Sequence, residues 1–202
     1  MPSILDKVLA KRPGNVVARW GASSRVPVLN PRDLARALEP LPLVSVKVTA
    51  SSPLGGLLRA ARDADAPLGF GLSWPWVRGE PLALVEAVRA VAEELRHQRP
   101  LFFEAGPLPI DRVARAQEQV FDLVDAGFCM ISLEDGEELE AVGQAALERE
   151  LPVEVGTPQI RTTLASQGEA LWYADALELF ERLGLQGAGS RAIRFLAEEA
   201  DE

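Results

Sequence analysis

The chain has little of what enzymes use for nucleophilic or zinc chemistry. Its 202 residues include one histidine, His97, and one cysteine, Cys129. A single cysteine excludes an internal disulfide, and the apolar run Phe128–Leu133 around it indicates a small buried thiol rather than a nucleophile. A zinc site needs about three or four donors, so one histidine excludes a site built from several imidazoles. We interpret His97, near the end of a helical stretch, as a solvated cation.

Lysines, basic clusters and long apolar runs are scarce as well. Lysine occurs only at positions 7, 11 and 47, the arginines are scattered, and the net charge is −9. This balance excludes a nucleic-acid surface and disfavours anionic membranes. No apolar stretch approaches the ~20 residues that span a bilayer, and the first residues do not read as a signal peptide, so we expect a cytoplasmic protein. There is no Ser/His/Asp grouping, CxxC pair, P-loop or dinucleotide fingerprint.

Short apolar runs alternate with amphipathic helical stretches, a pattern typical of βαβ units. No linker divides the chain, so we predict one α/β domain over 1–202: a helical extension with a weak first strand over 1–40, then β/α repeats over 41–202. The strand candidates are Val16–Trp20 (the weak one), Leu43–Thr49, Leu68–Trp74, Leu101–Ala105, Phe128–Glu134 and Pro152–Gly156. The helix candidates are Ser3–Lys11, Asn30–Leu38, Pro53–Ala64, Pro81–His97, Asp111–Ala126, Glu137–Arg149, Ala170–Leu183 and Ser190–Glu199.

The faces of the strands favour a barrel. In Leu43–Thr49 the valines face one side, while Ser45, Lys47 and Thr49 face the other. Small and polar groups on one face suit a barrel interior better than a sheet covered equally on both faces. Since a complete (β/α)₈ barrel usually needs about 250 residues, we predict a reduced or irregular TIM-like barrel, short of strands unless Ile160–Leu164 adds one or a partner chain completes it. The alternative is an open parallel sheet of six strands with helices on both faces.

Three glutamates, Glu104, Glu134 and Glu154, close apolar runs that read as buried strands. Buried strands rarely carry carboxylates, and the carboxyl ends of parallel strands are where ligands bind. If the strands are neighbours, the three carboxylates meet at one rim. There they would hold Mg²⁺ or Mn²⁺, or raise one pKa to create a general base. The alternative is that each is solvated or pairs with an arginine.

Four segments resemble the class II fructose/tagatose-bisphosphate aldolase superfamily. They are Arg99–Pro107 (RPLFFEAGP), the helix end Leu123–Phe128 (LVDAGF), Met130–Gly136 (MISLEDG) and Leu151–Thr157 (LPVEVGT). The similarity covers about residues 44 to 160, and Leu123–Glu134 also resembles the non-catalytic tagatose-bisphosphate aldolase subunit. The resemblance implies a β/α barrel. Members that cleave aldols hold zinc with histidines, beside an aspartate that acts as acid and base.

This chain departs from that pattern at its centre. Glu104-Ala105 stands where the family has Asp-His, so the aligned zinc ligand is absent. The chain also ends before the family's last strands, which carry much of its phosphate site. Zinc-dependent aldol cleavage is therefore not expected of this chain.

Further groups have two interpretations each. Lys47 would pair with one of the glutamates or form a Schiff base. Gly187, Gly189, Ser190 and Arg191 would bind a phosphate, or belong to a helix cap and turn. Trp74 and Trp76, around a proline in a strand-end loop, would stack a ligand or anchor a partner, or plug the top of an incomplete barrel.

Two functions follow from these patterns. The first is a non-catalytic, aldolase-like structural or regulatory subunit that assembles with itself or with a related enzyme. The second is a Mg²⁺- or Mn²⁺-dependent lyase or isomerase that uses the strand-end carboxylates on a small phosphorylated or carboxylated substrate.

Overall fold

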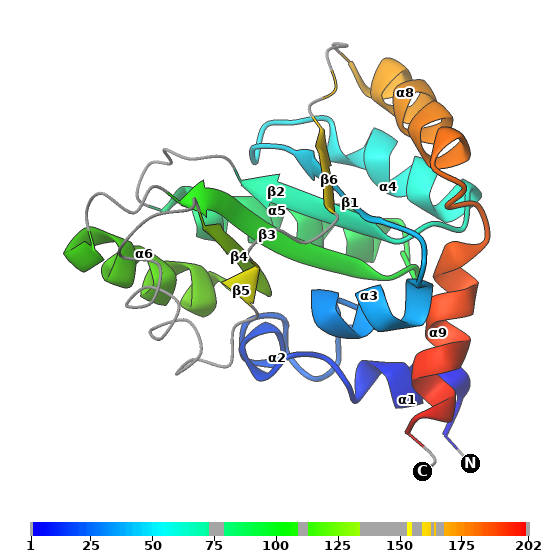
Figure 1. The fold of residues 1–202 in the computed structure, drawn as a ribbon, viewed down its shortest axis with the longest axis horizontal. Coiled ribbons are helices and arrows are strands. Elements are labelled where there is room, and N and C mark those ends of the chain that lie inside the picture. The colour runs from blue at the N-terminus through cyan, green and yellow to red at the C-terminus, as the bar shows by residue number, and fades with distance from the viewer. Residues whose placement is uncertain are drawn as a thin grey trace.

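The computed structural model shows an α/β protein built on a parallel sheet (Figure 1). It describes residues 2–72, 79–108, 113–133, 153–154, 159–162, 164 and 168–200. The strands are β1 Leu43–Lys47, β2 Leu68–Leu72, β3 Leu101–Leu108, β4 Met130–Leu133, β5 Val153–Glu154 and β6 Gln159–Thr162. The helices are α1 Ile4–Leu9, α2 Gly14–Trp20, α3 Pro31–Leu38, α4 Leu54–Asp63, α5 Glu80–Glu94, α6 Val113–Ala126, α8 Glu169–Arg182 and α9 Ala188–Glu198.

The order of the strands is β5-β4-β3-β2-β1-β6, and every neighbouring pair is parallel. The last strand therefore lies beside the first, as in a closed barrel. Glu154 and Gln159 are five residues apart, so at most about 18 Å of chain joins β5 to β6. A flat sheet of this order would place them about 24 Å apart. The sheet therefore curls into a barrel that is open between β5 and β6 within the described residues. This confirms the predicted irregular TIM-like barrel, with Ile160 in the added strand β6.

The two faces of the sheet differ as the period-two pattern predicts. Val44 and Val46 share their face with Phe70 and Phe103. Phe103 packs against Trp20 with ring centroids 5.9 Å apart and against Phe128 at 5.7 Å. The helices α4, α5 and α6, which connect β1 to β4 along the chain, pack side by side. The apolar face is therefore the one covered by helices.

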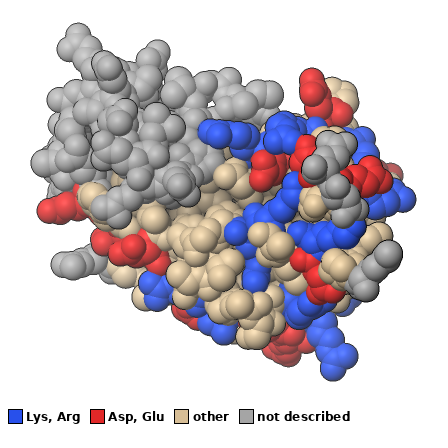
Figure 2. Space-filling view, turned by 90° about the horizontal axis from the view of Figure 1, so that it is seen from below, with Lys and Arg blue, Asp and Glu red and all other residues tan. Residues whose placement is uncertain are grey.

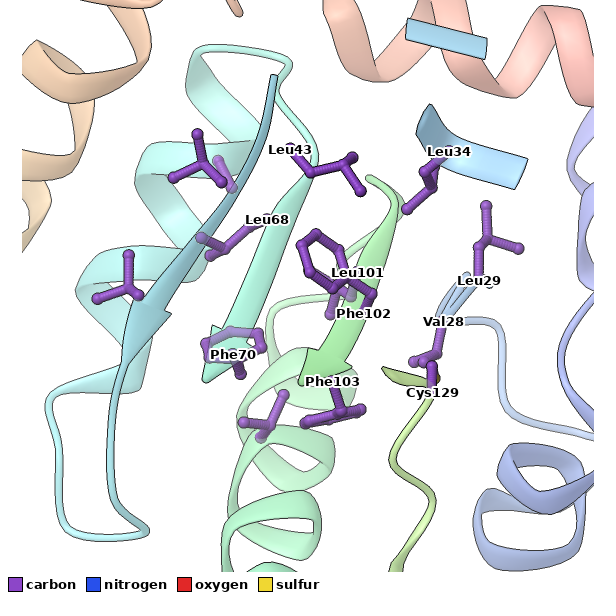
Figure 3. Close-up of a cluster of buried hydrophobic side chains, with 14 of the residues drawn as sticks. Val28, Leu29, Leu34, Leu43, Leu68, Phe70, Leu101, Phe102, Phe103 and Cys129 are labelled. Carbon is purple, nitrogen blue, oxygen red and sulfur yellow. The ribbon is translucent and has the colours of Figure 1, made fainter. Parts of the chain in front are cut away.

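The N-terminal segment covers the amino ends of the strands. Leu29 N–H donates to the carbonyl of Leu101 at 2.8 Å, and Leu101 N–H donates to the carbonyl of Pro27 at 3.0 Å. Figure 3 shows Val28 and Leu29 in one cluster with Leu43, Leu101 and Phe102. This segment closes the apolar bottom of the barrel.

The prediction of a weak strand over Val16–Trp20 is wrong, because these residues form α2. Val16 and Trp20 are buried, four residues apart on one side of the helix. The Asn15 side-chain amide donates to the carbonyls of Val124 and Phe128, which fixes α2 against α6. A run of five mostly apolar residues fits a buried helical turn as well as a strand, and only the packing partners decide. The helix predicted over Glu137–Arg149 lies outside the described residues.

The two ends of the chain are joined because α1 and α3 both pack against α9. Glu199 accepts from Lys11 Nζ at 3.3 Å and from Arg36. Figure 2 shows Lys and Arg side chains gathered toward one side of the face seen from below, with Asp and Glu among them. Glu199 therefore neutralises part of the positive charge in this region.

Candidate functional site

The polar face of the sheet places one buried carboxylate between two hydroxyls. Glu104 of β3 is 1% exposed. Its Oε2 accepts a hydrogen bond from Ser45 Oγ of β1 at 2.5 Å, and its Oε1 accepts one from Ser132 Oγ of β4 at 2.7 Å. Ser45 and Ser132 are themselves buried. Three strands thus contribute one side chain each to a polar cluster inside the barrel, which we call the Glu104 cluster.

Two glycines of β2 lie between the strands that contribute Ser45 and Glu104 to this cluster. Ser45 and Glu104 stand on β1 and β3, two strand spacings apart, or about 9.6 Å. Between them β2 presents Gly69 and Gly71 on the same face, because Ser45 pairs with Gly69 and Glu104 with Gly71. A Cβ on Gly69 would lie 2.3 Å from Phe102 Cζ and 2.8 Å from Ser45 Cβ. Gly69 therefore leaves the space that the Phe102 ring fills, and Gly71 places no side chain between Glu104 and Ser45.

The chemistry of the Glu104 cluster is that of a satisfied buried carboxylate. Each oxygen already accepts a hydroxyl hydrogen bond, and the side chain has almost no contact with solvent. Such a group does not abstract a proton from a dissolved substrate unless the cluster opens. Among the described residues, no three His, Cys, Asp or Glu side chains are placed to share a metal ion.

Glu134 and Glu154, the other two carboxylates of the predicted rim, are placed only in part. Glu154 of β5 pairs in register with Ser132, so its position is on the face that carries Glu104. The side chain of Glu154 and the whole of Glu134 lie outside the described residues, as do Trp74 and Trp76. Convergence of the three carboxylates stays a prediction.

Lys47 ends β1 on the polar face and is partly buried. Gly71 is its partner on β2, and Glu104 is the partner of Gly71 on β3, so a glycine alone separates the two positions. No ion pair within the described part of the chain involves Lys47. Pairing with a glutamate outside that part stays a prediction.

The glycine-rich segment at the start of α9 has the geometry of a helix cap. Gly189 N–H donates to the carbonyl of Asp65 at 2.7 Å, and Ser190 N–H donates to Asp65 Oδ1 at 3.0 Å. Arg191 donates to the carbonyl of Leu38. A phosphate at Gly187, Gly189, Ser190 and Arg191 would have to displace Asp65. The arrangement therefore favours the capping alternative.

His97 is not a solvated cation, and this expectation is corrected. It is 1% exposed, and burial lowers its pKa to about 4, with a further lowering from Arg99 and Arg62. The carbonyls of Arg99 and Leu58 offset this lowering only in part. The last turn of α5 ends with Arg96 in a left-handed conformation, which turns the next side chain inward. Cys129 is buried as expected, and burial raises its pKa to about 12.

Ser45 and Ser132 were not predicted as partners of Glu104 from the sequence. Both stand on the polar face by the period of two, and Gly69-Phe70-Gly71 marks the strand across which Glu104 reaches. Alternating glycines on a buried strand were the signal that could have located this cluster, since they mark close approach of other groups.

Comparisons with known proteins find weak similarity, among solved structures only. No protein-family model matches the chain, and a search of curated proteins finds no match. Among solved structures, the chain is similar to the YdjI aldolase from Escherichia coli K12 (TM-score 0.49, 10% identity, 78% of this chain and 97% of that one). It is also similar to a protein described as a fructose-1,6-biphosphate aldolase from Coccidioides immitis (TM-score 0.48, 11% identity, 87% and 99%). A third is a protein from Sinorhizobium meliloti 1021 described as a tagatose 6 phosphate kinase (TM-score 0.43, 18% identity, 74% and 47%). No residue role is transferred from them.

Proposed function

We propose that this protein is a non-catalytic, aldolase-like subunit of the cytoplasm that acts by assembling with itself or with a related enzyme. The observation that supports this most directly is the state of Glu104. By the motif resemblance, Glu104-Ala105 stands where aldolases that cleave their substrate have an acid/base aspartate and a zinc-binding histidine. Here the carboxylate is enclosed by Ser45 and Ser132, and alanine has no donor atom. The position serves packing rather than catalysis.

The open side of the barrel is the place for assembly. In the described part of the chain, neither β5 nor β6 pairs with a further strand on its outer side. Unpaired strand edges are covered in stable proteins, since their free N–H and C=O groups otherwise attract other chains. A second subunit that covers this side would complete the barrel from outside.

A metal-dependent lyase or isomerase is the second candidate. The observation in its favour is the register of Ser132 with Glu154, which brings a second carboxylate-bearing residue onto the face of Glu104 next to the cluster. In this alternative, Mg²⁺ or Mn²⁺ would bind between the carboxylates of Glu104, Glu134 and Glu154.

One set of measurements separates the candidates. Light scattering coupled to size exclusion gives the mass in solution, alone and mixed with a class II aldolase from the same organism. Thermal melting with saturating Mg²⁺, Mn²⁺ or Zn²⁺ tests metal binding, because a ligand of the native state raises Tm. We expect a defined oligomer or a mixed complex and no rise in Tm. A strict monomer with no partner contradicts the assembly proposal. A metal-dependent rise in Tm that Glu104→Gln removes supports the second candidate.

A further inference from the structure

Four helices of this protein end in the same type of turn. Just beyond α4, α5, α6 and α8, a backbone N–H donates to the carbonyl of the residue five positions earlier. The four bonds are Ala66 to Ala61, His97 to Ala92, Phe128 to Leu123 and Leu185 to Phe180. In each case the residue that precedes this donor has a positive φ, and its own N–H donates to the carbonyl three residues earlier. The two hydrogen bonds together define a Schellman motif. Glycine is the residue that this position favours.

Two of these turns use glycine, and two do not. Gly127 and Gly184 end α6 and α8, whereas Asp65 (φ 52°) ends α4 and Arg96 (φ 49°) ends α5. The side chain of Asp65 explains its presence, since it accepts from Ser190 N–H and pairs with Arg99 Nε at 2.5 Å. Arg96 is exposed and forms no ion pair or hydrogen bond through its side chain in the described residues. The strained position is therefore filled by a cation without an internal partner.

Arg96 borders a cavity of about 460 Å³ between the segment 23–26 and the last turns of α5. Its charged lining consists of Arg25, Arg89 and Arg96 with Glu93, a formal charge of +2 on a protein whose net charge is −9. Arg25 pairs with Asp6. Arg89 pairs with Glu86 and Glu93, and all three carboxylates lie at the surface. Exposed pairs of this kind contribute little to stability.

The wall formed by 23–26 is fixed and presents an unused polar group. The buried guanidinium of Arg12 donates to the carbonyls of Leu9, Ala22 and Ser24, which holds this segment in place. Ser24 is 6% exposed and lines the cavity, and its Oγ is itself buried and has no hydrogen-bond partner among the described residues. A buried hydroxyl without a partner costs free energy, and the side chain recovers that cost if it turns toward a ligand in the cavity.

We propose that this cavity binds a small phosphate monoester, with Arg96 as the residue that contacts the phosphate. Arg25 and Arg89 already pair with carboxylates, so Arg96 supplies the uncompensated positive charge of the lining, which attracts a phosphate anion. Guanidinium groups bind phosphate oxygens in a bidentate manner, and the volume fits a ligand of sugar-phosphate size. The cavity lies at the amino end of β3, because Gln98 lines it and β3 begins at Leu101. It is therefore separate from the Glu104 cluster and independent of the proposed function.

Arg96→Gly tests the proposal with a variant that is expected to keep the stability of the wild type. Glycine suits the left-handed position, so the variant folds with an unchanged or higher Tm in the absence of ligand. The matched control is Arg32→Ala, which removes an exposed arginine of α3 that does not line the cavity. Isothermal titration calorimetry of wild type and both variants uses inorganic phosphate and ribose 5-phosphate as probes.

We expect both probes to bind the wild type at millimolar or lower concentration, with ribose 5-phosphate the tighter of the two. Arg96→Gly weakens binding about tenfold or more, the loss of one charge-assisted contact, and Arg32→Ala leaves it unchanged. The proposal is overturned if neither probe binds, if Arg96→Gly binds both as tightly as wild type, or if Arg32→Ala loses as much affinity. Equal affinity for the two probes would mean that the cavity binds inorganic phosphate without recognising the sugar, and this result also overturns the proposal of a monoester site.

Discussion

The Glu104 cluster allows a test of whether its carboxylate is held as an ion. Ser45→Ala removes the hydroxyl that donates to Glu104 Oε2 at 2.5 Å, in a place that water does not reach. A hydrogen bond to a charged group contributes about 1.5–3 kcal/mol, and one between neutral groups about 0.5–1.5 kcal/mol. We expect Ser45→Ala to lower the free energy of unfolding by about 2 kcal/mol, or roughly 4–8 °C in Tm for a chain of this size.

The same change in a Glu104→Gln background has a smaller expected effect. The amide still offers an acceptor or donor to each serine, but the bonds are between neutral groups. Ser45→Ala then costs about 1 kcal/mol, which leaves a coupling of about 1 kcal/mol between the two positions. Urea unfolding of the wild type, both single variants and the double variant measures this cycle. Ser190→Ala is the matched control, since the Ser190 hydroxyl forms no hydrogen bond within the described residues.

Two results would refute the reasoning. Equal losses from Ser45→Ala in both backgrounds would show that Glu104 does not interact with Ser45 as a charged group. A clear rise in stability from Glu104→Gln alone would show that the carboxylate is strained, as expected if the glutamates of the predicted rim repel one another. That second result would favour the metal-dependent candidate over the non-catalytic subunit.

Three further predictions concern groups outside this cluster. The pKa of His97 is lowered from 6.5 to about 4 in the folded protein, so at pH 5 the unfolded chain binds a proton that the folded chain does not. The free energy of unfolding should therefore fall by about 2 kcal/mol from pH 7.5 to pH 5. Chemical unfolding at both pH values should show this drop, and His97→Gln should largely abolish it. Cys129 is buried with its pKa raised to about 12, so it should resist iodoacetamide in the native protein and react once urea unfolds the chain. If the native protein reacts as fast as an exposed thiol does, Cys129 is not buried. Asp65→Ala should lower Tm by about 2–8 °C through loss of the cap on α9 and of the pair with Arg99, whereas Asp65→Gly should recover part of this loss by relieving the positive φ.

Much of the fold could be predicted from the sequence because local patterns determine it. The period of two in Leu43–Thr49 assigned Ser45 and Lys47 to one face and the valines to the other, as the register shows. Asn30 was predicted to begin a helix, and its side chain caps α3 by accepting from Arg32 N–H. These features depend on residues close together in the chain, so one sequence suffices to find them.

The site could be predicted only to the level of single strands. The sequence singled out Glu104, because buried strands rarely carry carboxylates, and the structure shows this side chain buried. It did not assign Ser45 and Ser132 as its partners, since they stand 59 and 28 residues away. It also assigned Val16–Trp20 to a strand, because the contacts of Asn15 with α6 do not show in the local pattern.

Local patterns in the sequence suffice to predict the alternation of strands and helices and the polar and apolar faces of the sheet, and a single histidine excludes an imidazole cluster. Long-range packing places β6 beside β1, brings Asp65 to cap a helix 125 residues away and sets Arg96 at the border of a cavity. These differ because backbone geometry and side-chain period act over a few residues, whereas the environment of a side chain depends on which distant segments pack against it.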